Sequence, residues 1–306
     1  MFQKLNNLLK LLCFILFLPQ LSISKTLILN WKAEPQFGGF YAAHYPDVQI
    51  LQGGSGTPTV QMLGAGKSEY AIVSAEEILI YNSKNPSSPI KALFAVYQEN
   101  PQIIMCHLDL GFKNLKDVYS SGVMISMQSG LSYSLYLDKK FPKNKVKKVP
   151  YLGGLTTFLK TKSMCNQGFY TSEPITAELN GSKVKSFLIS EEGFNPYTTV
   201  LAVKADYLNK NTNEVKLMFQ KTKQGWESYL QHPDDTNLQM QHFNPSMSLE
   251  IFQKSAKAQQ TLIQKPNIPL GSMSNDRWQT LIDQLYELGI IKERLKAVDQ
   301  WIDLKL

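Results

Sequence analysis

Arginine and cysteine are both scarce in this 306-residue chain, and each scarcity narrows what the protein can be. Arg277 and Arg294 are the two arginines. Because sites for carboxylate, sulfonate or phosphate commonly use a bidentate guanidinium, this scarcity disfavours an anionic ligand. Three cysteines are too few for a disulfide-stapled mini-fold. Cys106 and Cys165 lie outside the apolar N-terminal run, and their spacing leaves open whether they are joined.

Motifs for catalysis and for metal binding are also missing. None of the four histidines has HExxH or another metal-ligand spacing, and there is neither a G-x-S-x-G elbow nor a P-loop. The glycine-rich segment 53–57, GGSGT, lacks the Walker lysine and the Rossmann spacing. It predicts either a polar loop that donates N–H groups to a ligand or a plain strand-to-helix turn. We expect no catalytic residue, no metal and no cofactor.

The N-terminus has the features of an export signal. Lys4 and Lys10 precede an apolar run over 11–18, and small residues, Ser22 and Ser24, stand where a signal peptidase inspects the chain. The run is shorter than the roughly 20 apolar residues that span a bilayer. We expect residues 1–24 to be a signal peptide cleaved after Ser24, which leaves a soluble exported protein.

The charge of the chain gives little sign of a nucleic-acid partner. The formal net charge is +7, and losing the two leader lysines lowers it to +5. Apart from one cluster over 139–148, the lysines are scattered, and no arginine accompanies that cluster. We therefore expect a solvated face there and no nucleic acid bound to the protein.

Short β-type runs alternate with helical ones up to about residue 205, as is typical of βαβ units and a parallel sheet. The predicted strands are 26–31, 48–51, 70–73, 90–97, 102–106, 123–127, 147–151, 168–171, 185–189 and 199–203. Ser74 with Glu77 predicts a capping box, and Thr57 before Pro58 predicts a helix start. Three later helices are predicted at 213–231, 248–263 and 275–288, the last capped by Asn275.

This layout predicts two α/β lobes. Residues 25–106 and 200–306 would form the first lobe, and residues 107–199 the second. The chain would cross out near Cys106 to Gly111 and return near Pro196 to Val200. Two such crossings would make a hinge.

Two segments carry the polar groups that best fit a ligand. Asn30 and Trp31 follow a predicted strand, and open α/β folds bind small molecules at the carboxyl ends of their strands. An amide and an indole can hydrogen-bond and stack with a flat polar ligand, although Trp31 could equally be a packing residue. Glu173 stands between another strand and Pro174. Its carboxylate could bind an aminated ring or a cation, or it could serve as a helix-dipole carboxylate.

Eight segments, in this order, resemble the periplasmic substrate-binding proteins of ABC importers, in the group that includes the sulfonate-binding and thiamine-pyrimidine-precursor proteins. They are LNWKAEPQFGGFYAA, DVQIL, LGAGKSEYAIVSAEEIL, ALFAVYQENPQIIM, LKDVYSSGVMISMQSG, VPYLGG, GFYTSEPITAELNG and NPYTTVLAV. The resemblance runs from about Thr26 to Lys223. It implies an α/β type II periplasmic-binding-protein fold, whose two lobes are joined by a two-strand hinge.

The same resemblance implies where the protein acts and with what. A small-molecule ligand would be held between the lobes in the periplasm and delivered to an ABC permease in the inner membrane. We expect a monomer. By similarity to the pyrimidine-binding branch, Asn30 and Trp31 would line the site from the first lobe, and Glu173 from the second. Further ligand contacts are expected from residues at strand ends or in aromatic turns: Phe40, Tyr41, Ser74, Gln98, Ser129, Gly130 and Tyr197.

This chain departs from the family pattern in one respect, and the superfamily includes one enzyme that has to be considered. The stretch from Tyr41 to Val48 is shorter than is usual in the family, so the first helix is expected to be short. The superfamily also contains a pyrimidine synthase that uses pyridoxal phosphate and iron. Its cofactor lysine and sacrificial histidine would align with Val73 and Glu77, and its cysteine-rich iron motif is absent here.

We therefore expect a binding protein and not an enzyme. Its ligand is expected to be a small heteroaromatic molecule, with a thiamine-pyrimidine precursor as the leading candidate. The alternatives are an HMP-phosphate synthase-like enzyme, a binding protein for a sulfonate- or nitrate-type anion, and a sensor component or scaffold. Kinship of fold does not choose among ligands.

Overall fold

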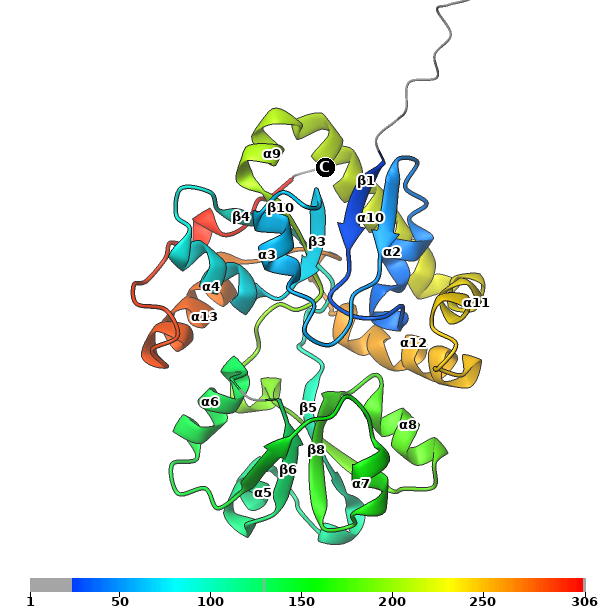
Figure 1. Cartoon of the computed structure of the whole chain (residues 1–306), viewed down its shortest axis with the longest axis vertical. Helices are drawn as coiled ribbons and strands as arrows, with labels where there is room; N and C mark the ends of the chain where they lie inside the picture. The colour runs from blue at the N-terminus through cyan, green and yellow to red at the C-terminus, as the bar shows by residue number, and fades with distance from the viewer. Residues whose placement is uncertain (1–23, 129, 305–306) are drawn as a thin grey trace, which may run out of the picture.

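The computed structural model describes residues 24–128 and 130–304, which form two α/β lobes stacked along the long axis of the molecule (Figure 1). Each lobe is built on a five-stranded sheet. The predicted signal peptide lies outside the described residues apart from Ser24, and so does Ser129. Among the residues described, no helix is long and apolar enough to span a membrane.

The two sheets share one strand plan. The first has the order β2-β1-β3-β10-β4, with β1 (Lys25–Ile28), β2 (Val48–Leu51), β3 (Tyr70–Val73), β4 (Ile90–Ala95) and β10 (Val200–Lys204). The second has the order β7-β6-β8-β5-β9, with β5 (Gln102–His107), β6 (Met124–Met127), β7 (Lys147–Pro150), β8 (Met164–Phe169) and β9 (Val184–Leu188). In each sheet four strands run in one direction, and the fourth strand in the order, β10 or β5, runs antiparallel to both of its neighbours.

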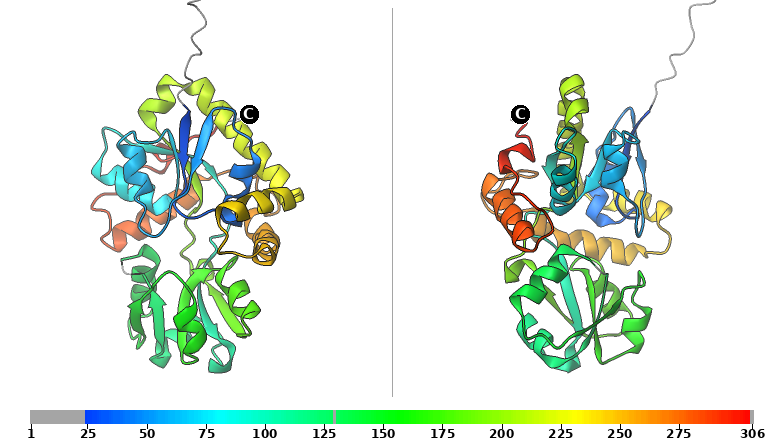
Figure 2. Two further views of the ribbon diagram at one scale, coloured as in Figure 1. Left: turned by 45° about the vertical axis from the view of Figure 1, so that its right-hand side comes forward. Right: turned by 60° about the vertical axis from the view of Figure 1, so that its left-hand side comes forward.

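Helices cover both sheets, and the late ones belong to the first lobe. That lobe contains α2 (Gly38–Ala42), α3 (Thr59–Gly64), α4 (Ala75–Lys84), α9 (Ala205–Lys210), α10 (Thr212–Gln231), α11 (Asp234–Phe243), α12 (Leu249–Ile263) and α13 (Asn275–Glu287). The second contains α5 (Leu115–Ser121), α6 (Ser132–Lys140), α7 (Thr156–Lys160) and α8 (Glu173–Leu179). Figure 2 shows α12 lying on the side of the first lobe that faces the second, where it contacts α8.

Helix starts confirm one sequence prediction and correct two. The Ser74 capping box is present, because its Oγ accepts from Glu77 N at 3.3 Å and the Glu77 carboxylate accepts from Ser74 N at 2.8 Å. Thr57 does not cap α3, which begins at Thr59. Instead, the Oγ1 of Thr57 accepts a hydrogen bond from Gly54 N. The cap of α13 is Ser274, one residue before the predicted position.

The chain leaves the first lobe earlier than predicted. β5 pairs with β8 and β9 along its length, so it belongs to the second lobe. Ile103 and Met105 on β5 pack in a core of that lobe with Phe158. Our boundary at residue 106 is therefore wrong, and the outward passage lies between β4 and β5. The return passage lies between β9 and β10.

A disulfide joins Cys106 of β5 to Cys165 of β8. The two residues stand directly opposite each other in the antiparallel register, and both side chains are buried. The spacing of the two cysteines in the sequence did not decide whether they are joined, and the structure shows that they are. The bond crosslinks two adjacent strands in the interior of the second sheet.

Arg277 of α13 fastens the two passages between the lobes to each other. Its guanidinium donates to Gln98 O at 2.7 Å on the outward passage, and to Asn195 O at 2.6 Å on the return passage. It also lies 3.9 Å from the ring centroid of Tyr197. Burial lowers the pKa of Arg277 to about 10. One of the two arginines thus has a place in the hinge, where its donors satisfy backbone carbonyls.

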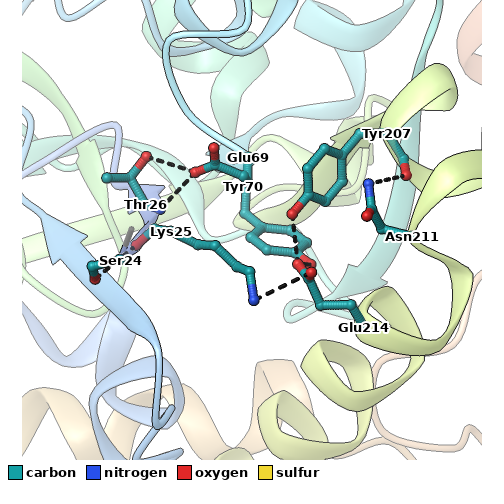
Figure 3. Close-up of polar contacts among 8 residues, drawn as sticks. All are labelled: Ser24, Lys25, Thr26, Glu69, Tyr70, Tyr207, Asn211 and Glu214. Atoms are coloured by element: carbon teal, nitrogen blue, oxygen red, sulfur yellow. Dashed lines mark hydrogen bonds and ion pairs between the residues drawn. The ribbon is translucent and has the colours of Figure 1, made fainter. Parts of the chain in front are cut away.

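A second polar cluster lies at the end of the first lobe that is far from the second lobe (Figure 3). The Glu214 carboxylate accepts from the hydroxyls of Tyr70, at 3.0 Å, and Tyr207, at 2.6 Å, and it pairs with Lys25 at 3.2 Å. Burial and the charge of Glu214 together raise the pKa of Tyr70. The cluster links the start of β1 to β3 and α10. A ligand site would therefore lie at the opposite end of the sheet, which faces the second lobe.

Candidate functional site

The turn after β1 carries a carboxylate that the sequence analysis did not single out, Glu34. The half-buried Trp31 packs against the first-lobe core and donates from Nε1 to Glu34 Oε1 at 3.0 Å. Glu34 has an extended backbone and stands directly before Pro35, which opens a 3-10 helix over Pro35–Phe37. The available signal was the dipeptide Glu34-Pro35, which repeats the Glu-Pro pair already noted at Glu173.

The glycine-rich loop over 53–57 packs against the turn that carries Trp31 and Glu34. Gly53 N donates to Trp31 O at 3.1 Å. A Cβ at position 53 would meet Leu29 O at 2.2 Å, so only a glycine lets the loop approach β1 this closely. The segment GGSGT was predicted to be either a ligand-binding polar loop or a plain strand-to-helix turn. The contacts of Gly53 are those of a close turn.

In the second lobe, Glu173 opens α8 and folds back onto the strand before it. Its Oε2 accepts from Phe169 N at 2.7 Å, and its Oε1 makes a long contact of 3.5 Å with the Tyr151 hydroxyl. A Cβ on Gly168 would lie 2.8 Å from the Glu173 side chain, so the glycine makes room for the carboxylate. Burial raises the pKa of Glu173.

The charge of Glu173 acts on Glu34 across the junction of the lobes. Burial, and after it the charge of Glu173, raise the pKa of Glu34 to about 8, against the smaller opposing effects of Trp31 and Lys32. A cavity of about 10 Å³, room for about one water molecule, lies between Glu34 and Pro35 on one side and Thr171 and Ser172 on the other. The lobes are therefore closed around this point.

Two hydrogen-bonded networks hold the walls in place. In the first lobe, the Tyr97 hydroxyl donates to Gln259 Oε1 at 2.8 Å, and Gln259 Nε2 donates to Pro35 O at 3.0 Å. In the second, the Tyr133 hydroxyl donates to Gln167 Oε1 at 2.9 Å. Burial and the charge of Glu173 raise the pKa of Tyr151, which keeps its hydroxyl a donor. Tyr97 is thus within the electrostatic influence of Glu34, and Tyr151 within that of Glu34 and Glu173.

Several predicted site residues are buried and do not line the cavity at the junction of the lobes. Phe40 has no exposed surface and packs 5.7 Å from Trp226, inside the first lobe. Tyr41 is buried against Phe243 at 5.8 Å. Gln98 and Tyr197 are buried in the hinge with Arg277. Aromatic residues near strand ends are ambiguous from sequence because the same rings suit a core.

The other predicted contacts remain predictions. Asn30 is half-buried in the turn beside Trp31. Ser74 stands at the end of β3 with its hydroxyl engaged in the helix cap. Gly130 is exposed and has a φ of 76°, next to Ser129, of which nothing is described. Among the residues described, no cluster of histidine, cysteine or carboxylate side chains could hold a metal ion.

Two α/β lobes with the same strand order, joined by two passages and closed on a polar and aromatic junction, define the periplasmic-binding-protein fold. This confirms the predicted fold class. The profile of the family described as NMT1/THI5 like matches residues 36–236, which is more than half of the chain, so the chain belongs to that family. No curated protein is significantly similar to it in sequence.

Solved structures of low sequence identity share the fold. The aliphatic sulphonate binding protein SsuA of Escherichia coli has a TM-score of 0.68 at 11% identity, over 92% of this chain and 94% of its own. The alkanesulfonate-binding SsuA of Xanthomonas axonopodis pv. citri, bound to MOPS, has a TM-score of 0.64 at 12% identity, over 91% and 98%. A Candida albicans gene product with the generic periplasmic binding protein fold has a TM-score of 0.59 at 15% identity, over 89% and 92%.

Proposed function

We propose that this chain is the solute-binding component of an ABC importer, which acts in the periplasm and delivers its ligand to a permease in the inner membrane. The family, the two-lobed fold and the hinge support this role. A hinge between two lobes lets a protein close on a ligand, and closure is a state that a transporter can recognise.

The proposed ligand is a small amino-substituted heteroaromatic molecule, with a thiamine-pyrimidine precursor as the first candidate. The observation that carries this proposal is that Glu34, which accepts from Trp31, is within the electrostatic influence of Glu173, which contacts Tyr151. Carboxylates accept paired hydrogen bonds from ring amino groups, and Trp31 and Tyr151 offer flat surfaces for stacking. A sulfonate or nitrate would instead meet two carboxylates, since Arg277 is engaged in the hinge.

Ligand screening tests the proposal. We expect aminopyrimidines to raise the melting temperature and to bind in calorimetry, while sulfonates and nitrate do neither. Glu173→Gln should weaken the aminopyrimidine at least about tenfold, because a charged hydrogen-bond acceptor is lost. Glu178→Gln, on the exposed end of the same helix, is the matched control. If sulfonates or nitrate stabilise the protein and every aminopyrimidine, thiamine and flavin leaves it unaffected, the proposed ligand class is wrong.

The enzymatic alternative is tested by a different measurement. Val73 is fully buried in the first sheet, opposite Val200, and Glu77 is engaged in the cap of α4. We expect no absorbance of bound pyridoxal phosphate and no HMP-phosphate formed with iron and oxygen. A bound-cofactor absorbance that disappears on reduction would favour the enzyme.

A further inference from the structure

The polar cluster of Figure 3 surrounds the first residue of β1, Lys25. The N–H of Lys25 donates to Asp47 O at 2.9 Å, directly before the start of β2. Ser24 is exposed, and its hydroxyl makes a long local contact of 3.4 Å with Lys25 O. The pairing of β1 with β2 therefore begins at the residue that would become the first one after cleavage at the predicted site.

Two carboxylates lie beside this first residue. Glu214 pairs with Lys25 Nζ at 3.2 Å. Glu69 accepts from Thr26 N at 2.7 Å and from the Thr26 hydroxyl at 3.1 Å. Since successive backbone nitrogens lie at most about 3.6 Å apart, the backbone nitrogen of Lys25 lies within about 6 Å of the Glu69 carboxylate.

Negative charge is in excess in this cluster while Lys25 N is part of a peptide bond. Burial and the charges of both carboxylates raise the pKa of the two tyrosines that donate to Glu214, so their phenols stay neutral. The Lys25 ammonium balances Glu214. Among the residues described, Glu69 contacts neutral donors on Thr26 and forms no ion pair, and Asp47 beyond Lys25 N is exposed and acidic as well. The surroundings of Lys25 N therefore suit a further positive charge.

We propose that Glu69 and Glu214 form a binding site for the α-ammonium group that cleavage of the leader creates on Lys25. A signal peptidase hydrolyses the bond between Ser24 and Lys25 with one water molecule. The carboxylate leaves with the leader, and the new amine takes a proton from the solvent. One N–H of the ammonium keeps the bond to Asp47 O, and another turns toward Glu69. The two carboxylates are then balanced by the two ammonium groups of Lys25.

This inference rests on the export that is part of the proposed function, and it adds a structural role for the processed N-terminus. A carboxylate nearby favours the charged form of an amine, so the pKa of the α-ammonium group should lie about one unit above its ordinary value of about 8. Its contribution to stability is complete below about pH 8 and is lost as the pH rises past about 9.

Two measurements on the unsubstituted sequence test the site. The protein is exported with its own leader, and mass spectrometry should find Lys25 as its first residue. Chains that begin at Lys25 and at Leu21 are then released from a fusion partner that is cut directly before the chosen residue. Competitive acetylation at a series of pH values, with the labelled amine assigned by fragmentation, gives the α-amino pKa of each chain.

We expect the raised pKa in the chain that begins at Lys25 and the ordinary pKa in the chain that begins at Leu21, whose amine is displaced by four residues. The urea midpoint of the Lys25 chain should be the higher of the two at about pH 7, and the difference should disappear at about pH 10, where both amines are neutral.

A substitution tests which group holds the amine. Glu69→Gln keeps an oxygen that can accept from Thr26 N but removes the charge, so the α-amino pKa of the Lys25 chain should return to about 8. Glu227→Gln, at an exposed position of α10, is the matched control and should leave the pKa raised. An exported protein that begins at another residue, an ordinary α-amino pKa in the Lys25 chain, or a raised pKa that Glu69→Gln does not lower overturns the inference.

The outcomes separate this inference from the proposed function. The cluster lies at the end of the first lobe that is far from the second lobe, so both chains should bind an aminopyrimidine equally. A raised α-amino pKa, without binding of any aminopyrimidine, thiamine or flavin, supports the amine site and removes the proposed ligand class. Binding of an aminopyrimidine with an ordinary α-amino pKa supports the proposed function and removes the amine site.

Discussion

The indole nitrogen of Trp31 donates a hydrogen bond of 3.0 Å to the carboxylate of Glu34. Both residues stand in the turn after β1, so the contact is local and does not depend on the position of the second lobe. A donor to the ionised form lowers the pKa of a carboxyl group, and here it opposes the burial and the charge of Glu173 that raise it. Trp31 therefore has an electrostatic effect on Glu34 besides offering a ring for stacking.

Replacing Trp31 by Phe should raise the pKa of Glu34 further. The ring surface is kept in part and the donor is lost, and a hydrogen bond to a charged group is worth about 1.5 kcal/mol, or roughly one pKa unit. Carbon-13 NMR titration of labelled glutamate carboxyls measures the shift. Trp301→Phe is the matched control, because it removes an equivalent 2.9 Å bond to Asn275 away from the site. An unchanged Glu34 pKa would mean that the indole does not act on the carboxylate.

The stability of the ligand-free protein should decrease as the pH rises through neutrality. Glu34 has a pKa of about 8 in the folded chain against an ordinary value of 4.5, so between these values the folded state holds a proton that the unfolded state has lost. Its stabilising contribution is complete below the unfolded pKa and is lost as the pH passes about 8. Each such group accounts for at most about 1.4 kcal/mol per pH unit.

Urea denaturation at about pH 5.5 and about pH 8 measures this dependence, and Glu34→Gln should make it shallower. Glu76, with a pKa raised to about 7 by burial, contributes in the same direction and stays in the variant. The slope should therefore be reduced but not abolished. A stability that rises over this range in the wild type, or an unaltered slope in the variant, contradicts the expectation.

The fold was predictable because its signals are local and repeated. Each predicted strand has a counterpart among the observed strands, and β2 and β3 have the predicted bounds. The passage between the lobes was misplaced because β5 is an apolar strand like its neighbours, and nothing in its residues states which sheet it joins. Strand pairing is a long-range property that periodicity does not contain.

The site was predictable where a polar residue follows a strand and precedes a helix-starting proline. Glu173 was found by this signal, and Glu34 carries the same signal in Glu34-Pro35. Phe40 and Tyr41 are buried in the first-lobe core and do not line the cavity, and their sequence does not reveal this because an aromatic residue suits both a core and a cleft. The position of Arg277 in the hinge could not be foreseen, since its partners lie about 80 and 180 residues away in sequence.

Reduction of the disulfide should destabilise the protein. The bond between Cys106 and Cys165 closes a loop with a sequence separation of 59, for which the chain-entropy estimate is about 4 kcal/mol. Urea denaturation with and without a reductant measures the effect. The double variant Cys106→Ala, Cys165→Ala should be insensitive to the reductant, which separates loss of this bond from other effects. A midpoint that the reductant does not move in the wild type would rule out a stabilising role.

Replacing Arg277 by Lys should destabilise the protein by about 3 kcal/mol and weaken the coupling between the lobes. The guanidinium donates to carbonyl oxygens on both passages between the lobes, and a single ammonium cannot reach Gln98 O and Asn195 O in the same fork geometry. The buried carbonyls then lose charged donors. Denaturation in urea measures the stability, and small-angle scattering measures the distribution of lobe separations in the absence of ligand.

Arg294→Lys is the control for this substitution, because Arg294 pairs with Asp283 at 2.7 Å on the surface, where an ion pair contributes little. We expect it to change the unfolding free energy by less than about 1 kcal/mol. Should Arg277→Lys match Arg294→Lys in both measurements, the guanidinium would not be what holds the hinge. A loss of stability with an unchanged distribution of lobe separations would restrict Arg277 to supporting the backbone, and the lobes would then be coupled elsewhere, for instance through α12 and α8.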